Sequence, residues 1–148
     1  LSYNEDIISL AIQLAQKTGY KIVYDLHTRE NLVLKNKFKE YGLATTAVGP
    51  LEFLALINGA SMILCDSFHG TAFSIILHKD FYTFGNYNGG IDISTRMKDL
   101  LEMLSLEKRY VTDNNTINFK PIDYADVDKR LDNLRKESIE FLKKSLES

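Results

Sequence analysis

Five consecutive residues, Ser67 to Thr71, combine side chains that can bind an anion with one that can move a proton. They read Ser-Phe-His-Gly-Thr and follow the apolar run 61–65, which is typical of a central strand. The apolar residues that come after them, through Leu77, favour a buried helix. A ligand at such a strand-to-helix turn meets backbone N–H groups and the positive end of a helix dipole. The turn is therefore the first candidate for a functional site.

The residue types in this turn point to anion binding and acid–base chemistry. The hydroxyl of Ser67 or Thr71 could assist the backbone N–H groups, and Gly70 would let a ligand approach the backbone closely. His69 could transfer a proton because histidine titrates near neutral pH. A structural account stays open beside this one, with His69 as a hydrogen-bonding residue and Asp66-Ser67 as a helix cap.

The elements around the turn are predicted from the apolar periodicity and from helix start and stop signals. Ser2 to Glu5 has the form of a capping box, and Gly19 predicts the end of the helix that follows. The strands that we expect cover 21–26, 44–48, 61–65 and 81–84. Further helices are expected over 31–41, 50–59, 70–78 and 94–104 and from about Tyr124, with a flexible glycine-rich loop over 85–90.

Strands that alternate with helices predict an α/β fold. We expect a Rossmann-like parallel sheet with helices on both faces and right-handed crossovers. The run 21–26 has few polar residues, as in a strand buried on both faces. In such a sheet ligands bind at the carboxyl ends of the strands, where Ser67 to Gly70 would lie.

Composition limits the classes of protein that need consideration. The length of 148 residues fits one domain, 1–148, and a net charge of −2 with scattered basic residues indicates no nucleic-acid partner. Cys65 is the single cysteine, which excludes an intrachain disulfide and cysteine-based zinc sites and favours a reducing compartment. The three histidines, His27, His69 and His78, show no metal-ligand spacing, so we predict no metal site.

The sequence also bears on location and completeness. No apolar run approaches the roughly 18–20 residues of a membrane span, and the N-terminus has no signal-peptide pattern. We therefore expect a cytoplasmic protein without a transmembrane segment, with peripheral association at the inner membrane face as a further possibility. The first residue is Leu1 and a helix pattern starts at once, which predicts a piece of a longer protein.

Three segments resemble the C-terminal half of the polysaccharide pyruvyl transferase family. They are residues 50–57, residues 60–74 and Ser94-Thr95-Arg96 with Leu100-Leu101. The most specific of them is the run S-F-H-G-T-x-F-S at 67–74. The order of elements is similar over residues 20–112, whereas the final helix matches only in type.

The resemblance implies one half of a GT-B-type enzyme, in which two Rossmann-like domains face a cleft. Members transfer the enolpyruvyl group of phosphoenolpyruvate to a sugar and generally form a cyclic pyruvate ketal. The implied partners are phosphoenolpyruvate, a sugar or lipid-linked oligosaccharide acceptor, and an N-terminal domain of the same chain. No cofactor is implied, and the implied role lies in capsule or exopolysaccharide biosynthesis.

The family's site residues carry over onto the same turn. His69 matches the histidine taken to act as an acid or to contact the donor, so the resemblance implies a catalytic role for it. Ser67, Phe68, Gly70 and Thr71 match the segment that lines the phosphoenolpyruvate site. Some relatives carry arginine where this chain has Ser67, so the charge that opposes the phosphate must come from elsewhere.

The replacement for that arginine is either Arg96 or the N-terminal domain. An arginine can bind a phosphate or carboxylate with two parallel hydrogen bonds. A solvated position on the helix 94–104 is the alternative account of Arg96.

Two other functions remain open from the sequence. One is a nucleotide-sugar glycosyltransferase of the same two-domain shape, and the other is a non-catalytic α/β binding module. If the chain is one half of a two-domain pyruvyl transferase, we expect residues 1–148 alone to fold without catalysing transfer.

Overall fold

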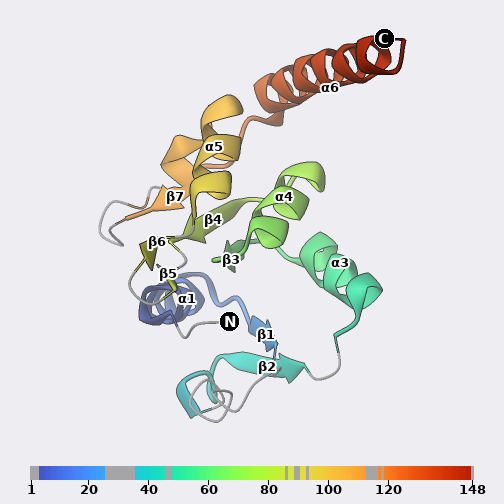
Figure 1. Cartoon of the computed structure of the whole chain (residues 1–148). Helices are drawn as coiled ribbons and strands as arrows, with labels where there is room; N and C mark the ends of the chain where they lie inside the picture. The colour runs from blue at the N-terminus through green and yellow to red at the C-terminus, as the bar shows by residue number, and fades with distance from the viewer. Residues whose placement is uncertain are drawn as a thin grey trace.

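A computed structural model describes most of the chain, namely residues 4–25, 36–45, 48–85, 87–88, 91–92, 94–112, 117 and 119–147. Helices and strands alternate along it, as Figure 1 shows. The helices are α1 (Glu5–Thr18), α3 (Pro50–Gly59), α4 (Phe68–Ile76), α5 (Thr95–Met103), the short 3-10 helix η1 (Glu107–Arg109) and α6 (Tyr124–Leu146). The strands are β1 (Ile22–Asp25), β2 (Gly42–Thr45), β3 (Ile63–Cys65), β4 (Phe81–Phe84), β5 (Tyr87–Asn88), β6 (Ile91–Asp92) and β7 (Tyr110–Val111).

The strands form a parallel sheet at the centre and two smaller ladders. The central sheet has the order β3-β4-β7, with Cys65 opposite Thr83 and Thr83 opposite Tyr110. Strands β1 and β2 form a separate parallel pair. The predicted mixed α/β fold with parallel strands is thus confirmed. Within the described ranges, however, the four predicted strands are divided between two ladders and do not form one sheet.

Strand β4 shows how helices cover both faces of the central sheet. Its four residues are all buried, and alternate side chains point to opposite faces. Phe81 packs in a cluster built with residues of α4, α5 and α6. Tyr82 and Phe84 pack against Leu10 and Leu14 of α1. The central sheet is therefore a layer with α1 on one face and α4, α5 and α6 on the other (Figure 1).

The first helix begins later than predicted and ends where predicted. Asn4 is its N-cap, and the side-chain oxygen accepts hydrogen bonds from the N–H groups of Asp6 and Ile7 at 3.1 and 3.3 Å. The N-cap is therefore Asn4, whereas Ser2, where the predicted capping box starts, lies outside the described residues. Gly19 ends the helix in the left-handed conformation, with φ of 73°.

Strand β2 begins two residues earlier than predicted and ends at Thr45. A Cβ atom at Gly42 would lie 2.8 Å from the ring of Tyr24 and 3.0 Å from the carbonyl oxygen of Ile22. Glycine therefore allows the backbone to pair opposite Ile22. The prediction that strand 21–26 is buried on both faces is wrong, since Val23 is half exposed.

Several further boundaries differ from the prediction. Helix α3 covers the predicted 50–59, whereas α4 begins at Phe68 rather than at 70. Residues 31–35 of the predicted helix 31–41 lie outside the described residues, and 38–41 form a turn. Part of the loop expected over 85–90 is strand, because Tyr87 pairs with Asp92 in an antiparallel ladder.

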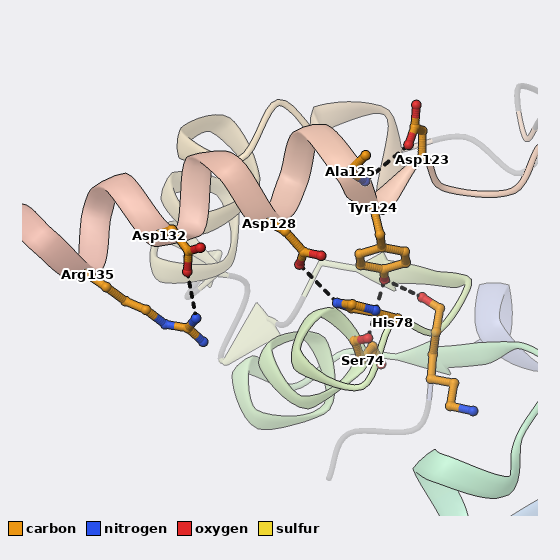
Figure 2. Close-up of polar contacts among 9 residues, drawn as sticks. Ser74, His78, Asp123, Tyr124, Ala125, Asp128, Asp132 and Arg135 are labelled. Carbon is orange, nitrogen blue, oxygen red and sulfur yellow. Dashed lines mark hydrogen bonds and ion pairs between the residues drawn. The ribbon is translucent and has the colours of Figure 1, made fainter.

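Helix α6 is anchored by its first half and extends away from the sheet (Figure 1). Val127, Leu131 and Leu134 pack on the core. The Tyr124 hydroxyl donates to the Lys79 carbonyl at 2.7 Å, and its ring stacks on His78 with centroids 4.5 Å apart. His78 in turn pairs with Asp128 at 2.9 Å, as Figure 2 shows. None of the helices in the described ranges combines the length and apolar character of a membrane span.

Removal of the Tyr124 hydroxyl tests this anchor. Burial raises the pKa of Tyr124, so the hydroxyl remains a donor at neutral pH. We expect Tyr124→Phe to lower the free energy of unfolding by about 1 kcal/mol, because the Lys79 carbonyl loses its partner. Urea denaturation measures the change. Tyr20→Phe at an exposed position is the control, and equal midpoints for the two variants would contradict the anchor.

Candidate functional site

The predicted turn lies at the carboxyl edge of the central sheet, between β3 and α4. Ser67 caps α4, and its Oγ accepts a hydrogen bond from the Gly70 N–H at 3.0 Å. The Ser67 carbonyl accepts from the Thr71 N–H at 3.1 Å. Ser67 therefore has a structural function as the helix cap. This agrees with the structural account, in which Asp66-Ser67 caps the helix. A contact between Ser67 and substrate stays a prediction.

Gly70 is buried where the first turn of α4 meets the end of β3. A Cβ atom there would lie 3.0 Å from the Cys65 Cβ, 3.1 Å from the Cys65 Sγ and 3.0 Å from the Ser67 Oγ. The absence of a side chain therefore permits the close approach of helix and strand. This is a packing reason for the glycine, distinct from the predicted approach of a ligand.

Thr71 points into the core. It is fully buried, and its Oγ1 lies 2.8 Å from the Oγ1 of Thr83 and 3.0 Å from the Ser67 carbonyl oxygen. Its hydroxyl is therefore bonded within the protein, and the predicted substrate contact stays a prediction. The Cys65 thiol lies beside this pair, and burial raises its pKa.

Three of the predicted site residues meet at the surface above this core. The Arg96 guanidinium lies over the Phe68 ring, 5.2 Å from its centroid. The Phe68 and His69 rings are 6.0 Å apart and almost perpendicular, at 82°. Arg96 and His69 are exposed, and Phe68 is partly buried. The fold thus brings Arg96 to the Phe68-His69 pair from 27 positions further along the chain.

The charges around this group favour an anion. Phe68, His69 and Gly70 form the first turn of α4, and Arg96 lies in the first turn of α5. Neither first turn contains an acidic residue. The positive ends of the two helix dipoles and the guanidinium therefore have the same sign.

Asp66 is a polar residue of the turn to which the sequence assigned only a role in capping. It is buried, and this burial raises the pKa of its carboxyl group. The one signal in the sequence was a carboxylate directly after an apolar strand. Among the described residues, no three His, Cys, Asp or Glu side chains form a group that could hold a metal ion. The absence of a cofactor stays a prediction.

One comparison with known proteins gives a match. A family model described as polysaccharide pyruvyl transferase matches residues 1–88, more than half of the 148 residues. The matched range includes the whole turn from Ser67 to Thr71 and ends before Arg96. A binding role of Arg96 is therefore supported by its place over the Phe68 ring and not by the family match. No curated protein and no solved structure matches the chain.

Substitution of Gly70 tests the close contact with Cys65. We expect Gly70→Ala to lower the free energy of unfolding by about 1–2 kcal/mol, because the new methyl group is overpacked. Gly59→Ala is the matched control, since a Cβ there has no atom within 4 Å. Urea denaturation of both variants is the measurement. A stable Gly70→Ala protein would show that the turn has more space than this packing allows.

Substitution of Asp66 tests its burial through the pH dependence of stability. The folded state holds the Asp66 proton more tightly than the unfolded chain, because the pKa is raised on folding. The protonated Asp66 therefore stabilises the folded state at pH values below the ordinary carboxyl pKa of about 3.9. This stabilisation is lost as the pH rises through the higher pKa that Asp66 has in the folded state. We therefore expect Asp66→Asn to gain stability relative to the parent protein between pH 4 and pH 7.

The measurement is urea denaturation at both pH values. Asp99→Asn, which makes the same change at an exposed position of α5, is the matched control. A relative loss of stability for Asp66→Asn between pH 4 and pH 7 would contradict the burial of the charge.

Proposed function

The chain belongs to the polysaccharide pyruvyl transferase family, and from this premise we propose that it binds phosphoenolpyruvate and transfers its enolpyruvyl group to a sugar. The product is a pyruvate ketal on a precursor of a cell-surface polysaccharide. The observation that carries the proposal is the group of Arg96, Phe68 and His69 at the carboxyl edge of the sheet.

Phosphoenolpyruvate carries a phosphate and a carboxylate, and the site offers positive charge to both. The Arg96 Cζ lies over the Phe68 ring and the residue is exposed, so its N–H groups can reach an anion at the surface. In this proposal Arg96 takes the place of the arginine that some relatives have at the position of Ser67. The N-terminal turns of α4 and α5 add to the attraction.

His69 supplies the proton in this proposal. Its imidazolium form protonates the methylene carbon of phosphoenolpyruvate, which leaves an oxocarbenium-like centre at the neighbouring carbon. One sugar hydroxyl attacks this centre, the C–O bond to phosphate then breaks, and a second sugar hydroxyl attacks the same carbon to complete the ketal. The two hydroxyl protons balance the reaction: one replaces the proton that His69 gave to the methyl group, and the other leaves with phosphate. Arg96 stabilises the departing anion.

The rest of the proposed enzyme follows from the resemblance to the family. We place most of the acceptor site on an N-terminal Rossmann-like domain, arranged with residues 1–148 as the two halves of a GT-B enzyme. The acceptor is a sugar or lipid-linked oligosaccharide, and the reaction takes place in the cytoplasm or at the inner membrane face. The reaction needs no cofactor.

Phosphate release from phosphoenolpyruvate tests the proposal, with the full-length protein and a panel of sugar acceptors. We expect release that depends on an acceptor and falls about 10²- to 10⁴-fold in His69→Ala, because the general acid is lost. His78→Ala is the matched control. His78 follows the C-terminal end of α4, where it contacts Tyr124 and Asp128, and its loss should leave the rate unchanged.

Other outcomes separate the alternatives. Equal rates of phosphate release in the His69→Ala and parent proteins would show that His69 is not the general acid. No release with any acceptor, together with binding of a nucleotide sugar, would indicate a glycosyltransferase. Binding of phosphoenolpyruvate without any turnover of the full-length protein would indicate a non-catalytic module.

A further inference from the structure

A pair of buried hydroxyl groups lies beneath the surface group of Arg96, Phe68 and His69. We propose that this pair, Thr71 and Thr83, acts through Met97 to position Arg96 over Phe68. The two threonines and Met97 are then positioning residues for the anion site. The inference rests on the proposed function for its kinetic consequence, whereas the positioning itself can be measured without any activity.

The hydroxyl pair joins α4 to β4. The two Oγ1 atoms are 2.8 Å apart, and both residues are fully buried. The Thr83 hydroxyl lies 3.2 Å from the Cys65 carbonyl oxygen, and the Thr71 hydroxyl lies 3.0 Å from that of Ser67. The pair thus holds both carbonyl groups that flank Asp66 in the turn.

The two hydroxyl protons are shared within a small set of acceptors. When one proton lies between the two threonines, the other reaches the carbonyl of Cys65 or of Ser67 or the Met97 Sδ, because a thioether sulfur accepts hydrogen bonds. Each arrangement uses both hydroxyls at once, so the loss of either hydroxyl changes the partner of the other.

Met97 connects this pair to α5. Its Sδ lies 3.5 Å from the Thr83 Oγ1 and 3.7 Å from the Thr71 Oγ1, and the residue is buried. A methionine side chain is flexible when nothing restrains it. The two contacts hold it against β4 and α4, and Met97 directly follows Arg96 in the first turn of α5.

The position of Arg96 therefore depends on the core below it. Arg96 is exposed, so its place over the Phe68 ring depends on where the first turn of α5 lies. That turn is held through Met97 to the threonine pair, and the same pair holds the turn that carries Phe68. A displacement of about 1 Å in a positioning group can reduce a reaction rate about 100-fold.

The test replaces Thr83 with valine, which keeps the shape and removes the hydroxyl. The first readout is the ring-current shift of the Arg96 side-chain protons, measured by NMR on the full-length protein with labelled arginine. Phe68→Leu defines the shift without a ring. We expect Thr83→Val to move the Arg96 signals toward those of Phe68→Leu and Thr83→Ser to restore them.

Two further variants complete the design. Ser74→Ala removes another fully buried hydroxyl of α4, which donates to the Gly70 carbonyl at 2.7 Å and has no part in the threonine pair. It should leave the Arg96 signals in place. Met97→Leu keeps the volume and removes the sulfur, so it should move the Arg96 signals even if Thr83→Val does not fold.

The second readout is kinetic. We expect Thr83→Val to lower kcat/KM for phosphoenolpyruvate about 10- to 100-fold, mainly through a higher KM, because an anion contact is misplaced. Thr83→Ser should recover the KM, and Ser74→Ala should keep it. A general loss of stability would affect Ser74→Ala as well.

The two readouts distinguish the two proposals. Arg96 signals that stay in place in both Thr83→Val and Met97→Leu would overturn the positioning inference, whatever the activity. If the parent protein transfers no pyruvyl group, the proposed function fails, and the NMR readout still decides whether the threonine pair positions Arg96.

Discussion

The first turn of α4 packs so closely on the end of β3 that a side chain at position 70 would be overpacked, and the site depends on this contact. A Cβ at Gly70 would lie 3.0 Å from that of Cys65. Because the helix begins against the strand, with Ser67 as its cap, Phe68 and His69 lie at the carboxyl edge of the sheet. The Thr71 side chain points into the core beside Thr83, so a pair of buried hydroxyl groups lies below the exposed residues of the site.

The opposite, amino edge of the central sheet is closed by the segment that leads into α6. Asp80, just before β4, accepts a hydrogen bond from the Ile122 N–H at 2.8 Å, and Tyr124 bonds to the Lys79 carbonyl at 2.7 Å. Arg109, just before β7, is buried and donates to the Lys120 carbonyl. These bonds between side chains and backbone join distant parts of the chain and cover this edge. The carboxyl edge has instead the exposed side chains of His69 and Arg96, as expected for the ligand side of a parallel sheet.

Elements whose signals lie within a few residues were predicted well. Helix α3 begins at Pro50 because proline suits a first turn, and α1 ends at Gly19 because glycine adopts a positive φ. Elements that depend on distant pairing were missed or misplaced. Strand β7 has only two residues and no periodicity of its own, so it is a strand because β4 lies beside it. Asn4 and Ser2 are both good caps, and local pattern could not choose between them.

The sequence by itself determined the parallel α/β character, the strand-to-helix turn at 65–71 and the histidine within it, because these depend on neighbouring residues and on a short motif. Only the tertiary structure decided that Arg96 lies over Phe68, that Thr71 is inside and that the Asp66 carboxyl is buried. The physical reason is the same in each case. A residue's burial and its partners depend on segments brought together from distant parts of the chain, and periodicity along the chain carries no information about those distances.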